Sequence, residues 1–538
     1  MEKKKGSFVQ GAAILGIAGL VVKVIGAAFR IPLANTIGLI GTSYYDTAYP
    51  YYSWLLVIST SGLPTAISKM VSERVTLGDY RGAHRVFTTA MQILCCIGLL
   101  TSILMFFGSD YIARLHMLPE AAYCFKALAP ALFFVALMCA YRGYMQGMQQ
   151  MVPTAISQVV EQVGKLVVGL SLAFMLLDQG PEYAAMGALI GVTVSELLAL
   201  VYVMLSYRRR WPRIRARLER SVRREVEPVA SRLLAIALPI CFVLLLPITI
   251  GASISPLASV VDSALIIRIL LKLGYAKETA QTAFSLMRTN VATLTNMPGV
   301  LTMALAMSLV PAISAFSAKR DHAGIQDTAR LGLKLALIIG LPCAVGLFVL
   351  ASPILSMLYP NLTEGELTLA TELMHTSSIG VIFLSLVQSM TGVIQGMGKP
   401  NVPVFNLFIG FVLKVASLLA LMNIPQVNIQ GAAVSTVVCY AFAGIADTIY
   451  VIRRAKLHLG LVDVLLKPLL SSGVMGFVVF MIYSFMQDMG HRVLSTLAAV
   501  AVGVFAYGVM AIYFRFFTRE ELANIPGGNR IRRIMYGN

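Results

Sequence analysis

Two lysines stand in the middle of apolar runs that are long enough to cross a membrane. Lys165 is eleven residues into the run near 154–177, and Lys414 is ten residues into the run near 404–423. At 1.5 Å of helix rise per residue, each lies roughly 15 Å from either edge, too deep for its ammonium group to reach water along its own side chain. A charge at that depth costs from about 2.5 to above 10 kcal/mol. Each lysine is therefore expected to face a protein interior or a water-filled cavity.

Other ionisable residues accompany these lysines. Glu161 lies one helical turn before Lys165 and is placed to neutralise part of its charge, whereas Lys414 has no such local partner. Lys23 and Arg30 are seven residues apart and share one face of the first predicted helix. The remaining candidates are Arg288, which precedes the eighth apolar run, and Asp46 and Asp262, which lie near predicted loops.

The excess of positive charge among these candidates indicates the chemistry they would perform. A central cavity lined by lysine and arginine suits an anionic substrate. Two alternatives stay open: the charges pair with one another, as Glu161 and Lys165 would, or they reach the membrane surface, as Arg30 would. Arg142 lies close to the cytoplasmic edge of its run and is predicted to anchor the helix at the interface.

The composition requires that these residues be positioned by membrane helices. Of the 538 residues 58% are hydrophobic and only 13% are charged, against about 25% charged in soluble domains. The expected fold class is an all-α polytopic membrane protein. Fourteen apolar runs of about 20 residues fall near 8–30, 47–69, 86–108, 126–147, 154–177, 185–206, 233–256, 293–316, 332–358, 372–394, 404–423, 430–451, 465–486 and 493–514.

The net charge of +18 is distributed as the positive-inside rule predicts. With fourteen spans and a cytoplasmic N-terminus, the Arg-rich segments 207–232 and 514–538 both fall on the cytoplasmic side. Exceptions are Arg114, Arg492 and the segment 257–292, which the count places outside. The distribution favours a cytoplasmic-membrane protein with both termini inside, and it argues against a nucleic-acid partner.

No pattern indicates bond-making chemistry. The seven cysteines lie in or beside apolar runs without CxxC spacing, so neither disulfides nor a metal is expected. HExxH, P-loop and GxSxG motifs in a suitable context are absent from the sequence, and no cytoplasmic segment is long enough for a nucleotide domain. The N-terminal "MEKKK" and its apolar run are interpreted as a retained first span rather than a signal peptide. The prediction is a non-enzymatic protein without a cofactor.

An internal repeat organises the runs. "GYMQGMQQMVP" from Gly143 matches "GVIQGMGKPNVP" from Gly392, 249 positions later, and "LPTAIS" matches "VPAIS" 247 positions later. "GALIGVTVSELLALVYVMLSYRRR" from Gly187 resembles "GAAVSTVVCYAFAGIADTIYVIRRA" from Gly431. Six helices separate the copies, so the repeat is parallel, and a site between two lobes would suit alternating access.

The repeat predicts the domain boundaries. The predicted parts of the chain are an N-lobe of six spans at 1–207, a basic cytoplasmic loop at 208–232, a C-lobe of six spans at 233–453, two further spans at 454–514 and a basic tail at 515–538.

Four segments carry a family resemblance. They are "GLVVKVIGAAFRIPLANTIG", "YPYYSWLLVISTSGLPTAISKMVSE", "RGYMQGMQQMVPTAISQVVEQ" and "LTMALAMSLVPAIS". They closely resemble the stage V sporulation protein B and MurJ-like branch of the polysaccharide-exporter and multidrug (MOP) superfamily. The resemblance covers essentially all fourteen helices. It implies a two-lobed fold that moves an undecaprenyl-pyrophosphate-linked saccharide, typically the peptidoglycan precursor lipid II, across the cytoplasmic membrane.

In MurJ-like flippases, cations on the first, second and eighth helices line the cavity, and the match here is partial. Lys23 matches one position on the first helix, and Arg30 falls one residue out of register with another. The second-helix arginine has no counterpart in "VISTSGLPTAIS", and Arg288 lies about one turn before the matching stretch of the eighth helix. These departures leave room for Lys165 and Lys414 to supply the charge.

The expected function is therefore a flippase that binds a polyprenyl diphosphate near Lys23, Arg30 and Lys165, with the prenyl tail in the bilayer. The resemblance permits coupling to Na⁺, H⁺ or the membrane potential, with Glu161 or Asp46 as ion-coupling carboxylates, and permits cell-wall synthesis proteins as partners. Two rivals are a multidrug antiporter of the same superfamily, which should carry an excess of buried carboxylates, and a non-transporting scaffold of an envelope-synthesis complex.

Overall fold

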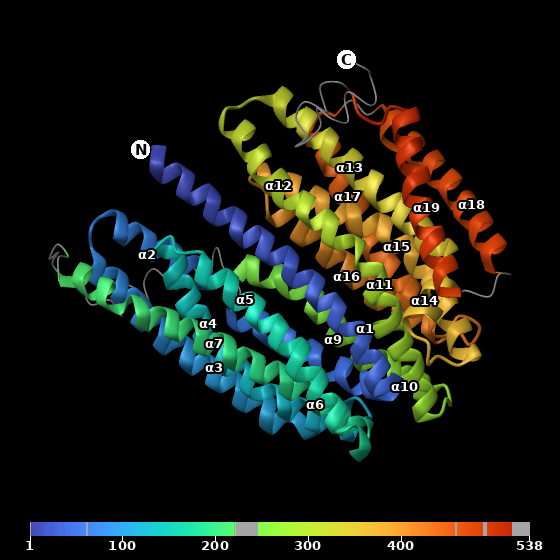
Figure 1. The fold of residues 1–538 in the computed structure, drawn as a ribbon, viewed down its shortest axis with the longest axis horizontal. Helices are drawn as coiled ribbons and strands as arrows, with labels where there is room; N and C mark the ends of the chain where they lie inside the picture. Colours follow the sequence, from blue (N-terminus) through green and yellow to red (C-terminus); the bar gives the residue numbers. More distant parts are fainter. Residues whose placement is uncertain are drawn as a thin grey trace. The chain divides into compact units, whose positions relative to one another are not determined.

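The computed structural model describes residues 2–60, 63–219, 221, 246–457, 460–487 and 492–518. Every regular element in these ranges is a helix (Figure 1). Thirteen helical segments are long and apolar enough to cross a membrane. The predicted class of all-α, multi-pass membrane protein is confirmed. Of the fourteen predicted runs, 233–256 falls mostly outside the described residues.

The chain forms two compact units, Met1–Ser285 and Leu286–Asn538. The helices of the first unit are α1 (Glu2–Thr60), α2 (Leu63–Thr76), α3 (Tyr80–Leu115), α4 (Ala122–Gly147), α5 (Val152–Gly164), the π-helical turn η2 (Lys165–Gly169), α6 (Leu170–Met175), α7 (Pro181–Glu219), α9 (Leu246–Lys272) and α10 (Lys277–Ser285). The repeat assigned α9 and α10 to the second lobe, but both pack on α1 and so belong to the first unit.

The second unit has the same kind of architecture. Its helices are η5 (Leu286–Val291, π-helical), α11 (Ala292–Asn296), α12 (Pro298–Ala318), α13 (His322–Val349), α14 (Ala351–Leu358), α15 (Glu364–Gly396), α16 (Asn401–Met422), α17 (Gln430–Ala455), η6 (Val462–Leu466, π-helical), α18 (Lys467–Gln487) and α19 (Arg492–Tyr513). The last two spans pack on each other, and α18 packs on α13.

A kink at Gly38 divides the long helix α1. The backbone there has φ 67° and ψ −176°, outside the helical region and in the positive-φ range that glycine adopts at little cost. The first predicted run and most of the second therefore lie within one helical element, with the kink between them. Asp46 follows the kink inside the second part of α1 and is fully buried. The prediction that Asp46 lies near a loop is wrong.

The helix α9 also departs from the prediction. It continues to Lys272, through the segment that was expected to lie outside the membrane, and Gly251–Lys272 is itself a candidate span. Asp262 therefore lies within this helix, 2% exposed, rather than near a loop. The reason is that only two charges, those of Asp262 and Arg268, interrupt an apolar stretch that otherwise has the length of a span.

Most of the predicted inter-lobe loop that the structure describes is helical. The helix α7 runs without a break from Pro181 to Glu219, so that its last three turns carry the arginine cluster. Arginine has a high helix propensity, and Arg215 pairs with Glu219 one turn later at 3.2 Å. The rest of that loop, from residue 222 to 232, lies outside the described residues.

The repeat is visible in how helices pack within each unit. In the first unit Gly143 and Gly147 bring α4 onto α2, where an added Cβ would lie 2.6–3.0 Å from Ile67 or Val71. In the second unit Gly392 and Gly396 bring α15 onto α12 in the same way, and an added Cβ would meet Ala306 and Ile313. Glycines four residues apart allow close approach of membrane helices. The duplicated motif therefore makes the same helix contact twice.

A second close contact joins η2 to α7 in the first unit, and it yields a stability prediction. A Cβ built on Gly191 would lie 2.2 Å from Gly169 Cα, a backbone atom that cannot move aside without shifting a helix. Gly191→Ala is therefore expected to lower the free energy of unfolding by about 1–3 kcal/mol or more. The readout is the thermal unfolding midpoint of the purified protein.

The matched control is Gly346→Ala in α13, where an added Cβ meets nothing within 4 Å. This variant should be neutral or slightly stabilising, because alanine restricts the unfolded chain. An equal loss of stability in both variants would show that the Gly169–Gly191 contact has no special role.

Candidate functional site

Buried charged residues gather where α1, α5 with η2, and α7 pack together in the first unit. We call Arg30, Asp46, Glu161, Lys165 and Glu196 the first-unit charge cluster. The three helices contact one another pairwise. Glycine on the facing surfaces lets them approach closely, since a Cβ on Gly164 would lie 2.9 Å from the Cβ of Ser195. The cluster is thus held by membrane helices rather than by loops.

Arg30 and Asp46 form an ion pair across the kink in α1. Arg30 Nη1 donates to Asp46 Oδ1 at 2.8 Å, and the Asp46 side chain is 0% exposed while that of Arg30 is 24% exposed. In a straight helix two residues 16 apart are about 24 Å apart along the axis. The fold-back at Gly38 removes that separation. The guanidinium also lies 5.7 Å from the ring centre of Tyr45, and the 24% exposure leaves part of the Arg30 side chain accessible.

Lys165 is buried among aromatic side chains. It is 8% exposed, and its Nζ donates to the hydroxyl of Tyr49 at 3.2 Å. The same Nζ lies 4.5 Å from the ring centre of Tyr49 and 5.1 Å from that of Phe29. Aromatic faces and a hydroxyl stabilise an ammonium group out of water. The positive charge is thereby retained deep in the unit without a carboxylate ion pair among the described residues.

Glu161 does not neutralise Lys165 as its spacing predicted. Its Oε2 accepts from Arg142 Nη2 at 3.3 Å, and its Oε1 accepts from the side chain of Gln162 at 3.2 Å. Arg142 Nε in turn donates to Ser157 Oγ at 2.9 Å. The Arg142 guanidinium therefore points toward α5 rather than toward the membrane interface, because the half-buried carboxylate of Glu161 offers it an ion pair. The prediction of Arg142 as an interface anchor missed this pair.

Glu196 was missed by the sequence analysis. It lies on α7, is 4% exposed and accepts a hydrogen bond from the Tyr52 hydroxyl on Oε1 at 3.2 Å. Its Oε2 is buried and has no hydrogen-bond partner among the residues that the structure describes. Tyr52 ends a row of rings in which Tyr45 and Tyr49 are stacked at 5.3 Å. The same reasoning that selected Lys165 applies to Glu196, which stands mid-way in the run 185–206.

Lys23 lies on the first part of α1 and is exposed. Separately, an apolar groove of about 710 Å³ runs between α1, α5 and α7, and Lys23 is not among the residues that line it. The residues that line it are Ala18, Val21, Ala155, Ile156, Val159, Val160, Val163, Gly164 and Leu198. The first unit therefore presents an accessible cation on α1 and, between α1, α5 and α7, an apolar groove.

The second unit carries its own buried charges. Lys414, on α16, is 6% exposed and occupies the place in the repeat that Lys165 has in the first unit. Arg288 is half-buried in η5. Lys334 on α13 is 2% exposed, with Nζ 5.6 Å from the ring centre of Phe517. Asp447 on α17 is fully buried and accepts from Asn406 Nδ2 at 2.7 Å. The last two were not selected from the sequence, although both stand in apolar runs.

A polar bridge ties the far end of α3 to the rest of the first unit. The carbonyl of Ser263 on α9 accepts from His116 Nδ1 at 2.9 Å, so Nε2 is left to accept from the Tyr51 hydroxyl at 2.9 Å. Burial lowers the pKa of His116 to about 4. The ring is therefore neutral at physiological pH and serves as a structural link between α1, α3 and α9.

Among the described residues, no group of three His, Cys, Asp or Glu side chains is placed to hold a metal ion. What the described site offers is charge: cations on α1 and η2, and carboxylates that are hydrogen-bonded to arginine or tyrosine. Such an arrangement can bind an anion or exchange a proton or a small cation, and it contains no evident nucleophile with an activating base.

These features define a polytopic helical membrane protein in which the same helix packing occurs in two units and each unit buries a lysine at the same place in the repeat. The chain belongs to the polysaccharide biosynthesis protein family, whose family model matches residues 8–317, more than half of its length. A second family model, MatE, matches residues 289–418. The predicted membership of the MOP superfamily is confirmed.

Three relatives from Bacillus subtilis (strain 168) align along nearly the whole chain. The uncharacterized membrane protein YabM is 28% identical, over 98% of this chain and 96% of its own. Stage V sporulation protein B is 24% identical, over 97% and 98%. Lipid II flippase MurJ is 24% identical, over 96% and 97%.

Solved structures share the fold. Lipid II flippase MurJ in an inward closed conformation superposes with a TM-score of 0.67 at 15% identity, covering 94% of this chain and 99% of that one. An inward-facing multidrug resistance MATE family transporter gives a TM-score of 0.65 at 14% identity, covering 82% and 98%. Both flippase and multidrug transporter folds are therefore compatible with this chain, and the site must distinguish them.

Proposed function

We propose that the protein is a flippase that moves an undecaprenyl-pyrophosphate-linked saccharide, with lipid II as the expected cargo, across the cytoplasmic membrane. The similarity to lipid II flippase MurJ and to stage V sporulation protein B over nearly full length supports the class of activity. The observation that carries the proposal is the charge of the first unit. An exposed lysine and a partly exposed arginine lie on α1, and a third cation, Lys165, is buried against Phe29 and Tyr49 of the same helix.

A diphosphate would be bound by this set in two layers. Lys23 and the exposed part of the Arg30 side chain would contact the diphosphate oxygens directly, since lysine and arginine form charge-assisted hydrogen bonds with phosphate. Lys165 is closed off by Tyr49 and Phe29, so it would act through its electrostatic field rather than by contact. Alternating access of the two lobes would then carry the head group across while the prenyl tail stays in lipid. No bond is formed or broken.

The coupling of transport to an ion is a separate part of the proposal. Asp46 and Glu161 are engaged by Arg30 and Arg142, whereas Glu196 keeps one buried oxygen without a hydrogen-bond partner. Glu196 is therefore the best-placed carboxylate of the cluster to take up a proton or Na⁺, ahead of the two that were selected from the sequence. Coupling to the membrane potential is the alternative energy source.

A multidrug antiporter is the second candidate, favoured by the match of residues 289–418 to MatE and by the MATE structural neighbours. An organic cation would need buried carboxylates that are not neutralised. In the first-unit charge cluster two of the three carboxylates are already paired with arginine, while Lys165 is not paired with a carboxylate among the described residues. Within this cluster an organic cation would have only the carboxylate of Glu196, whereas an anion would have Lys165 and the exposed Lys23 on α1, so the charges that are not in ion pairs favour an anionic cargo.

The experiment that tests the proposal is depletion of the protein in its native host, followed by extraction of polyprenyl-linked intermediates. Accumulation of lipid II, or of another polyprenyl-pyrophosphate saccharide, on the inner leaflet is expected. Unchanged intermediates together with new sensitivity to organic cations would point to the antiporter. Unchanged intermediates without new sensitivity to organic cations would support the non-transporting scaffold of an envelope-synthesis complex.

A substitution of Lys165 separates its contribution to function from its contribution to stability. Lys165→Met keeps the length of the side chain and removes a charge whose burial is costly. We expect an unchanged or higher unfolding midpoint together with a fall of about tenfold or more in the rate of translocation. Lys414→Met is the matched variant in the second unit. Loss of translocation that merely follows a loss of folded protein would count against an electrostatic role.

A further inference from the structure

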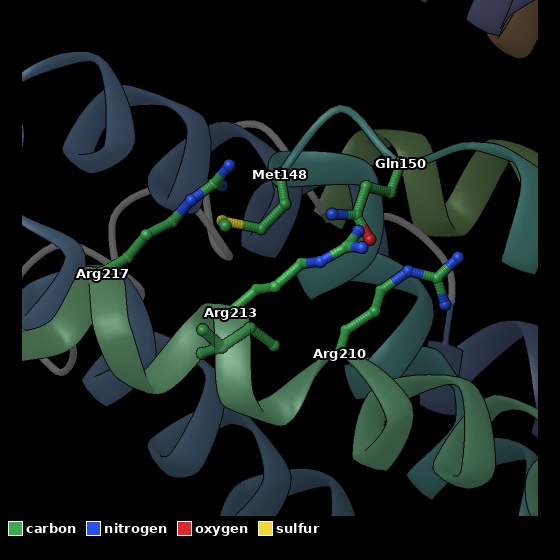
Figure 2. Close-up of a pocket in the computed structure, with 6 residues that line it drawn as sticks. Met148, Gln150, Arg210, Arg213 and Arg217 are labelled. Carbon is green, nitrogen blue, oxygen red and sulfur yellow. The ribbon is translucent and has the colours of Figure 1, made fainter.

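The cytoplasm-directed end of α7, as the positive-inside rule orients it, carries a pocket outside the first-unit charge cluster. The pocket has a volume of about 90 Å³ and is lined by Met148, Gln150, Arg210, Arg213, Ile214 and Arg217 (Figure 2). Three of these six residues are arginines and none is acidic. The transport mechanism proposed above makes no use of this pocket.

The three arginines form one wall because of their spacing. Arg210, Arg213 and Arg217 are three and four residues apart, and so they share one face of α7. Ile214, 6% exposed, packs inward and fixes the rotation of that face. Figure 2 shows the side chain of Arg213 extending toward Gln150, with Arg210 and Arg217 to either side.

The turn between α4 and α5 forms the opposite wall. Gln149 has φ 60°, and the backbone N–H of Gln150 donates to the carbonyl of Met145 at 2.9 Å, which holds the Gln150 side chain over the arginines. Gln150 Oε1 is buried, and no described residue forms a hydrogen bond with it. Rotation of this amide presents its NH₂ group in the same place, as a further donor.

The arginine charges of the pocket are not neutralised by carboxylates in the part of the chain that the structure describes. Arg210 Nη1 donates to the carbonyl of Ser206 at 3.0 Å, and Arg217 lies 5.8 Å from the ring centre of Tyr80. The ion pair of this helix, Arg215 with Glu219, lies on another face. Several guanidinium donors therefore converge on a small volume that lacks a counter-charge.

We propose that this pocket binds a phosphoryl group, that of an anionic phospholipid at the membrane surface. Guanidinium groups bind phosphate oxygens in pairs, and a pocket of this size, open to solvent on the side of Arg213 and Arg217, accepts one such group. Two observations favour a lipid over a soluble phosphate. Trp211 is 37% exposed and Leu205 is 48% exposed on the same stretch of α7, which is the side-chain pattern of the membrane interface. Basic pockets at this level bind anionic head groups.

The first test compares two double variants with the same change in net charge. In Arg213→Gln/Arg217→Gln both substituted residues line the pocket, and in Arg208→Gln/Arg209→Gln both are exposed on α7 outside it. Each full-length protein is placed in phosphatidylcholine nanodiscs with added phosphatidylglycerol, and the lipid retained after extraction is counted by native mass spectrometry. The pocket variant is expected to retain at least tenfold less phosphatidylglycerol than the wild type, and the control variant nearly as much as the wild type.

The second test inserts a negative charge and leaves every arginine in place. Gln150→Glu puts a carboxylate into the pocket, whereas Gln149→Glu puts the same charge on the adjacent exposed residue. Only the first is expected to release the lipid. If the pocket variant and its control lose the same amount of phosphatidylglycerol in both tests, the lipid is attracted by the general positive charge of α7. That result would contradict a specific site in the pocket. No selective retention by the wild type of either phosphatidylglycerol or inorganic phosphate would overturn it as well.

Binding of inorganic phosphate and of pyrophosphate is measured as well, to test whether the pocket takes a soluble ligand. Binding of inorganic phosphate that is lost in Arg213→Gln/Arg217→Gln, without retention of phosphatidylglycerol, would support the pocket and assign it a soluble ligand. All of these readouts are binding measurements, so they stand or fall independently of the proposed transport.

Discussion

Replacing Lys23 with glutamine is expected to abolish translocation of the polyprenyl-linked cargo while the protein is still made and folded. Lys23 is exposed on α1, so its loss removes a direct contact to the diphosphate and leaves no buried group behind. A direct charge-assisted contact made during transport is worth about 1.5–3 kcal/mol, so its loss should weaken binding of the diphosphate by roughly 10- to 150-fold and bring translocation below detection. The measurement is the flipping of labelled lipid II in reconstituted vesicles.

The control for Lys23→Gln is Lys69→Gln on α2, which removes one exposed positive charge elsewhere in the same unit. That variant should transport like the wild type. Transport at the wild-type rate by Lys23→Gln would remove Lys23 from the site, and equal slowing in both variants would reduce its role to net charge.

The Arg30–Asp46 pair is expected to give the largest effect on stability. Arg30→Met leaves the fully buried Asp46 carboxylate without its 2.8 Å partner. Breaking a buried ion pair from one side typically costs about 3–5 kcal/mol, whereas replacing both partners with apolar residues is often neutral. The double variant Arg30→Met/Asp46→Leu should therefore recover most of the stability that Arg30→Met loses. Thermal or denaturant unfolding of four proteins, the wild type, Arg30→Met, Asp46→Leu and the double variant, measures the coupling.

The same four proteins separate structure from function. If the exposed part of Arg30 binds the diphosphate, the double variant should regain stability but should still fail to transport the polyprenyl-linked cargo. Recovery of both would assign the pair a purely structural role at the kink in α1. If the double variant is as unstable as Arg30→Met, the stability lost in Arg30→Met does not come from the unpaired carboxylate of Asp46.

Most of the spans, the repeat and the burial of the two lysines could be predicted from the sequence, because they depend on local hydropathy and on spacing. The span Gly251–Lys272 was not predicted. The lysines at equivalent places, Lys165 and Lys414, are both buried, at 8% and 6% exposure. The duplicated glycines around Gly143 and Gly392 make equivalent helix contacts. Such features are fixed by the requirement that each span bury its backbone and its rare charges.

The pairing of the charges could not be predicted in the same way. Glu161 lies one turn from Lys165 but bonds to Arg142, and Lys165 instead reaches Tyr49, which is 116 positions earlier in the chain. The kink at Gly38 that brings Asp46 to Arg30 depends on a single positive φ value, which sequence periodicity does not report. Partner choice is set by tertiary packing, and spacing along one helix gives only the neighbours that are possible.

Direct binding of the cargo tests the central claim, that cations of the first unit hold a diphosphate. Purified wild type and Lys23→Gln would be titrated with lipid II, with undecaprenyl pyrophosphate and with ethidium as an organic cation, and bound ligand would be counted by native mass spectrometry. We predict that the wild type binds both diphosphates but not ethidium, and that Lys23→Gln loses the diphosphates. Binding of ethidium in preference to either diphosphate, or diphosphate binding that is unchanged in Lys23→Gln, would contradict it.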